Sequence, residues 1–159
     1  MYKIYTSYFY NVRFMTPNQV PLSTARWDPK WFHNLNSLDP EDVFFDKNGV
    51  INGLKLYEFV PDNSCVNLCK GRKECTLDYT TCDFLKKYRE QLSRIDLHHI
   101  EYRLNSIARN LLQDNKNPIN VTEFILLVYE TPDNPCSERV AIQEYFNSRG
   151  IECTERSFR

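Results

Sequence analysis

The sequence predicts a small open α/β fold, a three-layer sandwich in which a mostly parallel sheet of about four strands has helices on both faces. Three observations favour this class. A nearly continuous apolar run at 121–130 is typical of a central parallel strand that is covered on both sides. Apolar residues recur at helical spacing between residues 84 and 111. The predicted elements follow one another as strand, strand, helices, strand, helix and strand, which is an α/β order.

Length and composition narrow the class of protein. The chain has 159 residues, which fits one domain spanning 1–159, and a net charge of −1, which does not by itself require nucleic acid or a membrane. No stretch approaches the roughly 20 apolar residues that cross a bilayer. Residues 1–10 also lack the pattern of a secretory leader. We therefore expect a cytoplasmic protein without a membrane partner, whose six cysteines are thiols or metal ligands.

The first half of the chain supplies two strands and a long irregular stretch. Aromatic and β-branched residues predict strands at 3–10 and 19–27. Residues 27–45 are typical of a loop, with a helical turn that starts after Asp39 and has proline at its first position. Asn-Gly turn signals predict an irregular segment or a small hairpin at 46–59.

The second half alternates helices and strands. Apolar spacing predicts helices at 84–95 and 97–111, and Asp96 is a suitable cap for the second of them. The remaining predicted elements are a strand at 121–130, a helix at 135–150 that ends in glycine, and a last strand at 151–156.

The turn after the predicted central strand holds the candidate site, because ligands of open α/β sheets bind outside the carboxyl ends of the strands. Asn134 is a good N-cap, and Pro135 is a good first helical residue. This start would leave the N–H groups of Cys136 and Ser137 free at the positive end of a helix, where they would bind an anion. A cysteine in such a position is expected to have a lowered pKa.

Arg139 lies on the apolar stripe of the same predicted helix, together with Ile142 and Phe146, and so should face the sheet. A buried charge needs a partner. Two interpretations stay open, which are a structural ion pair with Glu130 or another carboxylate, and a bidentate grip on an anionic ligand. Glu130 is the candidate acid or base. Cys136 is the candidate nucleophile, although no histidine lies in the motif to activate it.

The ends of the first two predicted strands should reach the same edge of the sheet. Their hydroxyl groups, arginines and aromatic rings suit a phosphorylated, ring-bearing ligand such as a nucleotide. The alternative is that the rings belong to the core and the arginines to the solvated surface. The predicted ligand-binding residues are Ser7, Ser23, Arg26, Tyr129, Ser137 and Arg139.

Residues 61–82 form a cysteine-rich insertion. Four thiolates can close a tetrahedral zinc site, or hold an iron–sulfur cluster, and the sequence favours zinc. The spacing is not that of paired Cys-x2-Cys modules, so a loop with incidental thiols is the alternative. The candidate metal ligands are Cys65, Cys69, Cys75 and Cys82. A metal here would suit a non-catalytic nucleic-acid or protein-binding module, the second candidate function, and no organic cofactor is indicated.

Four segments together resemble a known family, and they read YTSYF, VPLSTARWDPKWF, LDPEDVFF and EFILLVYETPDNPCSERVAIQEYFNSRGIECTE. Over most of its length the chain resembles the domain-of-unknown-function 488 family. Members of that family look like a strand ending in Tyr-Glu, a short turn and a Cys-His-Arg motif. Tyr129, Glu130 and Cys136 match, whereas Ser137 and Glu138 replace the histidine and arginine. The resemblance implies a Rossmann-like α/β domain with no assigned reaction.

Overall fold

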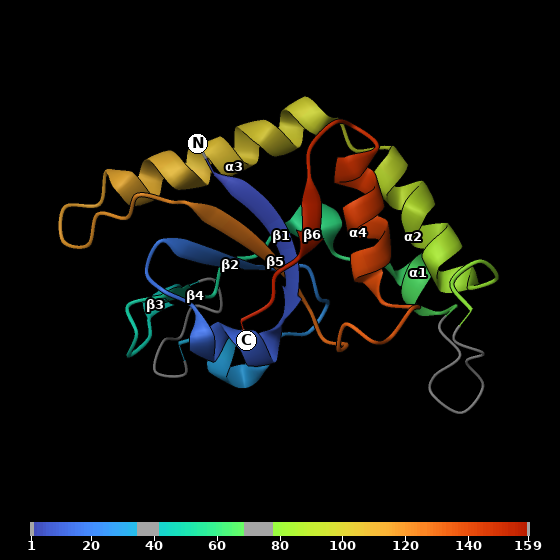
Figure 1. Ribbon diagram of the computed structural model, residues 1–159, viewed down its shortest axis with the longest axis horizontal. Helices are drawn as coiled ribbons and strands as arrows, with labels where there is room; N and C mark the ends of the chain where they lie inside the picture. The colour runs from blue at the N-terminus through green and yellow to red at the C-terminus, as the bar shows by residue number, and fades with distance from the viewer. Residues whose placement is uncertain (1, 35–41, 69–77, 159) are drawn as a thin grey trace.

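The computed structural model describes residues 2–34, 42–68 and 78–158, and its centre is a four-stranded parallel sheet (Figure 1). The strand order is β2-β5-β1-β6. The strands are β1 Lys3–Tyr8, β2 Gln19–Ser23, β5 Glu123–Val128 and β6 Cys153–Glu155. All three neighbouring pairs run parallel, so the predicted α/β class is confirmed.

Strand β5 is the central strand that its apolar sequence predicts. It pairs with β1 on one side and β2 on the other, and Phe124 lies opposite both Ile4 and Val20. Residues 124–128 are all buried. A strand with neighbours on both edges and side chains buried on both faces cannot alternate with polar residues, which explains the unbroken apolar run.

The two faces of the sheet are covered differently. One face packs against the four α-helices, and Figure 1 shows α2 and α4 side by side, with α3 crossing above the sheet. These helices are α1 Asn63–Val66, α2 Asp83–Ser93, α3 Leu97–Leu112 and α4 Glu138–Asn147. Short 3-10 helices cover the other face, where Phe9, Val12 and Phe32 pack against Ile125 and Leu127. They are η1 Phe9–Phe14 and η2 Lys30–Phe32, and a third, η3 Tyr57–Phe59, lies on the α-helical side.

The irregular stretch before the helices forms the predicted small hairpin. Strands β3 Phe44–Phe45 and β4 Ile51–Asn52 pair antiparallel. Gly49 allows the tight turn between them because its φ of +78° lies in the left-handed region. The helical turn predicted after Asp39 falls outside the described residues.

The boundaries of α3 and α4 show where the local sequence is enough to predict the start of a helix and where it is not. Asp96 caps α3 as predicted, because its side chain accepts a hydrogen bond from the N–H of His98. The predicted start of α4 at Asn134 and Pro135 is wrong, because the helix begins at Glu138 and its N-cap is Ser137. In the part of the chain that the structure describes, no helix is long and apolar enough to cross a membrane.

The connections locate a switch in topology between β1 and β5. After β1 the chain passes over the face that η1 covers, whereas after β5 it passes over the opposite face as α4. Because β1 and β5 are neighbours, their following segments diverge at the carboxyl ends of the two strands. Such divergence opens a crevice in which α/β proteins bind ligands.

Candidate functional site

The candidate site is the carboxyl edge, by which we mean the ends of β1, β2 and β5 with the segments that follow them, 9–14, 24–33 and 129–138. Most of the residues that the sequence assigns to a ligand lie here, and the structure divides them into two groups. One group surrounds Arg139 at the start of α4. The other lies in the loop after β2.

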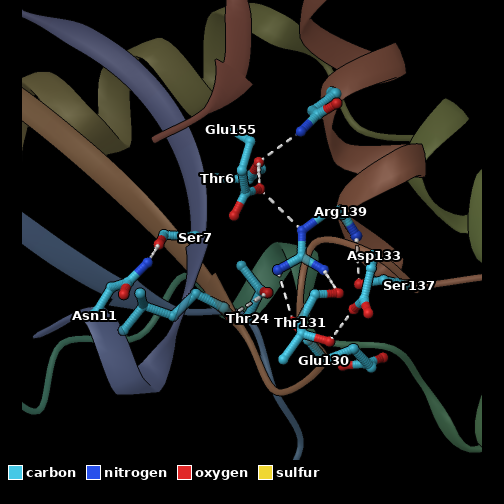
Figure 2. Close-up of polar contacts among 12 residues, drawn as sticks. Thr6, Ser7, Asn11, Thr24, Glu130, Thr131, Asp133, Ser137, Arg139 and Glu155 are labelled. Carbon is cyan, nitrogen blue, oxygen red and sulfur yellow. Dashed lines mark hydrogen bonds and ion pairs between the residues drawn. The ribbon is translucent and has the colours of Figure 1, made fainter. Parts of the chain in front are cut away.

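Arg139 is buried, with its side chain only 5% exposed, and its guanidinium joins three segments of the chain (Figure 2). Its Nε donates to the Glu155 carboxylate at 2.9 Å. Its Nη1 and Nη2 donate to the main-chain carbonyls of Thr131 and Glu130, both at 2.7 Å. The carboxylate partner is thus Glu155 on β6, while Glu130 contributes its backbone. This arrangement fixes the turn after β5 to the edge strand β6.

The Glu155 carboxylate connects this arginine to a wider polar network. Thr6 on β1 donates its hydroxyl to the same oxygen at 2.8 Å, and Gln143 on α4 donates to that hydroxyl at 2.7 Å. Thr6 is fully buried. Both bonds to Glu155 end on Oε1, whereas Oε2 is buried without a hydrogen-bond partner among the described residues. The shared Oε1 thus ties β1, β6 and α4 together.

The start of α4 is not the open anion site that the sequence predicts. The Cys136 N–H donates to the Asn134 side chain at 2.9 Å, and the Ser137 N–H contacts the Asn134 carbonyl at 3.4 Å. Ser137 is buried, and its hydroxyl accepts from the Arg139 N–H. The prediction that Cys136 and Ser137 present free N–H groups is therefore wrong. Cys136 is half-buried in the preceding turn, outside the first turn of the helix.

Two carboxyl groups make this side of the edge acidic. Burial, followed by the nearby charge of Glu130, raises the pKa of Glu138 to about 8, against the opposing effect of Arg139. Glu138 is therefore protonated at neutral pH. The sequence nominates Glu130 as the acid or base, but Glu138 is the carboxyl whose proton affinity suits a general acid.

A second polar cluster lies in the loop after β2 and centres on Asp28, whose side chain is 3% exposed. Ser23 donates its hydroxyl to Asp28 Oδ1, and His33 Nε2 lies 2.6 Å from Oδ2. Lys55 adds its ammonium 3.6 Å from Oδ1. Sequence reasoning identified Ser23 but missed Asp28 and His33, because nothing in their spacing indicates that one carboxylate joins them.

The imidazole ring of His33 is held in one orientation by its hydrogen bond to Asp28. When Nε2 carries its proton toward Asp28, the other ring nitrogen is left as an acceptor. That nitrogen, Nδ1, is buried and has no hydrogen-bond partner among the described residues. Asp28 and His33 therefore form a hydrogen-bonded carboxylate–imidazole pair in the loop after β2.

Aromatic rings surround this cluster and stay exposed. Tyr129 follows β5 and is 51% exposed, and Trp31 on η2 is 45% exposed. Both pack on the buried ring of Phe9, at centroid distances of 5.0 and 6.3 Å respectively. Burial and the neighbouring charge of Asp28 raise the pKa of Tyr129, which places that phenol near the Asp28 cluster. We call Phe9, Trp31 and Tyr129 the edge rings.

Arg26 is the candidate cation beside these rings. Its guanidinium lies 5.1 Å from the ring centroid of Trp27, which is 68% exposed. It donates from Nη1 to the Pro61 carbonyl at 3.4 Å, while its buried Nε has no partner within the described residues. Among the described residues the guanidinium of Arg26 thus has one hydrogen-bond acceptor, the Pro61 carbonyl, whereas that of Arg139 has three.

Ser7 does not reach a ligand directly. It is fully buried, and its hydroxyl accepts from the Asn11 side-chain amide at 2.9 Å (Figure 2). Thr24 is also buried and donates to the Leu127 carbonyl at 2.8 Å. These two residues fix how the segments after β1 and β2 leave the sheet.

The predicted metal ligands are only partly described. Cys69 and Cys75 fall outside the described residues. Cys65 on α1 is buried, Cys82 at the start of α2 is half-buried, and both belong to the core beneath the α-helices. Burial raises the pKa of the Cys65 thiol to about 11, and its Sγ lies 3.5 Å from the Gln91 side-chain oxygen. Within the described ranges no group of three or more metal-binding side chains gathers.

A separate hollow of about 370 Å³ lies near the opposite ends of the strands. Its walls are mainly the apolar parts of Tyr2, Ile4, Leu104 and Phe146, beneath α3. It lies away from the carboxyl edge and from the Asp28 and Arg139 clusters. We therefore place the chemistry at the carboxyl edge, where titratable groups gather at a topological switch.

No protein-family model, curated protein or solved structure matches the chain. The resemblance to the domain-of-unknown-function 488 family therefore stays a prediction. The function is inferred below from the residues of the carboxyl edge alone.

Proposed function

We propose that the carboxyl edge binds a nucleotide-like ligand, which is a planar ring joined to a phosphate. The observation that carries this proposal is the pair of exposed rings, Trp31 and Tyr129, held on Phe9 near the half-buried His33 and its buried partner Asp28. Each exposed ring forgoes the roughly 1.5–3 kcal/mol that burial of such a side chain gains. A nucleobase stacked on these rings would recover part of that energy.

Charge decides where the phosphate of this ligand would lie. Arg139 at the start of α4 is not available to the phosphate, because its guanidinium is already bonded to Glu155 and to the carbonyls of Glu130 and Thr131. Arg26 keeps donor capacity on the opposite side of the edge, in the loop after β2. The proposed pose therefore places the ring on Trp31 and Tyr129 and the phosphate toward Arg26.

If the protein transforms this ligand, two groups supply the proton chemistry. His33, oriented by Asp28, would accept a proton, and Glu138, neutral at pH 7, would donate one. Cys136 is not assigned a proton-transfer role in this scheme, and its N–H donates to the Asn134 side chain within the local loop. Its role in the site remains that of a wall.

Replacing Tyr129 with alanine should weaken the binding of a 5′-mononucleotide by about tenfold, since loss of one stacked base costs about 1–3 kcal/mol. The measurement is isothermal titration calorimetry with a panel of 5′-mononucleotides. Tyr102 on α3 is 67% exposed, and Tyr102→Ala is the matched control that should bind as the wild type does. Equal affinities in the wild type and the Tyr129→Ala variant would remove the stacking role.

The alternative proposal is a binding module whose cysteine-rich segment is ordered by zinc at Cys65, Cys69, Cys75 and Cys82. It is supported by the four thiols in one short segment and by the common core that Cys65 and Cys82 share. Elemental analysis of the purified protein should find about one zinc per chain. The zinc should be lost in a Cys69→Ser, Cys75→Ser variant and retained in Cys153→Ser. Metal-free protein that is fully folded would refute the site.

Membership of the domain-of-unknown-function 488 family and a cytoplasmic location are also proposals. The first is supported by the strand end at Tyr129 and Glu130 and by Cys136, which match the family pattern. The second is supported by the six cysteines, which are more typical of a reducing compartment when they are not paired as disulfides. Neither affects the geometry of the carboxyl edge.

A further inference from the structure

A second aromatic surface lies beside the edge rings, on the 3-10 helix that follows β1. Tyr10 and Phe14 are 41% and 42% exposed, and their ring centroids are 5.7 Å apart. Tyr8, at the end of β1, stacks on Tyr10 at 6.0 Å with an interplanar angle of 14°. We call Tyr8, Tyr10 and Phe14 the outer platform.

An arginine is fixed on this platform. The Arg13 guanidinium lies 3.9 Å from the Tyr10 ring centroid, and its Nε donates to the Tyr10 carbonyl at 3.0 Å. These two contacts hold the guanidinium over the ring while the residue remains exposed. Such a group offers a planar surface for a base and terminal N–H groups for a phosphate.

The outer platform and the edge rings are joined through consecutive residues of the chain. Phe9 supports Trp31 and Tyr129, and its chain neighbours on either side are Tyr8 and Tyr10. A ligand with a single base could occupy only one of the two surfaces. A ligand with successive bases could stack on both.

Charge on this surface also favours a polyanion. Between residues 9 and 34 the cations are Arg13, Arg26 and Lys30, and the single carboxylate, Asp28, is buried and paired. The same turn brings one more cation and one more carboxylate, because Asn48, which donates to the Arg13 carbonyl at 3.2 Å, follows the exposed Lys47 and also donates its N–H to Asp46. Cations interleaved with exposed rings are the pattern by which proteins hold single-stranded nucleic acid.

We propose that the ligand of the carboxyl edge is a single-stranded nucleic acid, which lays one base on the edge rings and the next on the outer platform. This inference rests on the proposed function and specifies its ligand class. Arg13 and Phe14 then serve the oligonucleotide alone, whereas Tyr129 serves a mononucleotide as well. A duplex is excluded because its bases are already stacked on one another.

The test compares three probes on the intact protein. They are thymidine 5′-monophosphate, a fluorescein-labelled oligothymidylate of about twelve nucleotides, and a duplex of the same length. The oligothymidylate should bind at least about tenfold more tightly than the mononucleotide, and its affinity should fall with added salt. The duplex should bind more weakly than the single strand.

The Arg13→Ala, Phe14→Ala variant should bind oligothymidylate about tenfold more weakly and the mononucleotide unchanged. Its matched control is Tyr102→Ala, Arg109→Ala on the exposed side of α3, which should leave both affinities as in the wild type. Three results would overturn this inference alone. They are equal affinities for the oligothymidylate and the mononucleotide, wild-type affinity for the oligothymidylate in the Arg13→Ala, Phe14→Ala variant, and tighter binding of the duplex than of the single strand. Failure of every probe to bind would overturn the proposed function with it.

Discussion

Replacing Arg139 with alanine is expected to lower the free energy of unfolding by about 3–5 kcal/mol, the usual cost of removing one partner from a buried ion pair. The substitution leaves the Glu155 carboxylate without its cation and the carbonyls of Glu130 and Thr131 without their donors. Thr6 still donates to Glu155, but the two carbonyls lose the guanidinium bonds that offset their removal from water. Arg139→Lys should show an intermediate loss, because a single ammonium cannot reach three acceptors in a planar arrangement.

Urea unfolding with linear extrapolation measures this effect. Arg89→Ala is the control, because the Arg89–Glu144 pair has a similar contact distance of 2.7 Å but lies at the surface, with side chains 32% and 50% exposed. Surface pairs contribute about 0–1 kcal/mol. If Arg139→Ala and Arg89→Ala were equally mild, Arg139 would not be holding the turn after β5 to β6.

Replacing Glu138 with glutamine should stabilise the protein above neutral pH. The pKa of Glu138 rises from its usual 4.5 to about 8 in the folded state. Between these values the folded protein keeps a proton that the unfolded chain has released, so the wild type loses stability as the pH rises. The favourable contribution is complete below the unfolded pKa and is lost as pH passes through the folded pKa. Glutamine stays neutral, so the variant avoids this loss, which is on the order of 3 kcal/mol.

The measurement is the free energy of unfolding of both proteins from pH 4 to pH 9, roughly the range between the two pKa values. Glu130→Gln should flatten the same slope in part, because the Glu130 charge raises the pKa of Glu138. Glu152→Gln, at an exposed position, supplies the same change in net charge and should keep the wild-type slope. A Glu138→Gln curve parallel to that of the wild type at every pH would show that Glu138 is an ordinary, solvated carboxyl.

The parts of the fold that the sequence predicts are those that depend on local pattern. Residues 124–128 are apolar because β5 is buried on both faces, and Asp96 caps α3 with a side chain only two residues from its donor. The start of α4 was mispredicted because Asn134 and Pro135 have the propensity of a helix start. Burial of Ser137 beside Arg139 moves the start three or more residues onward.

The polar clusters of the site were harder to foresee. The stripe of α4 correctly places Arg139 toward the sheet, but its partner Glu155 lies 16 residues away, on a strand that parallel pairing brings alongside β1. Asp28 and His33 lie in a loop without periodicity, and only the fold brings Lys55 beside them. The second face of the sheet is covered by short 3-10 helices. They are too short to produce a repeating pattern of apolar residues, so the sequence does not predict this layer.

The most direct test of the account uses the tryptophan emission of the unmodified protein. The chain has two tryptophans, Trp27 and Trp31, and both follow β2 at the carboxyl edge, so their fluorescence reports on this site alone. Titration with a 5′-mononucleotide should quench the emission to saturation, ribose 5-phosphate should not, and Tyr129→Ala should shift the midpoint to higher concentration. If neither mononucleotides nor oligothymidylate changed the tryptophan emission, the proposal that the carboxyl edge holds a nucleotide base would be contradicted.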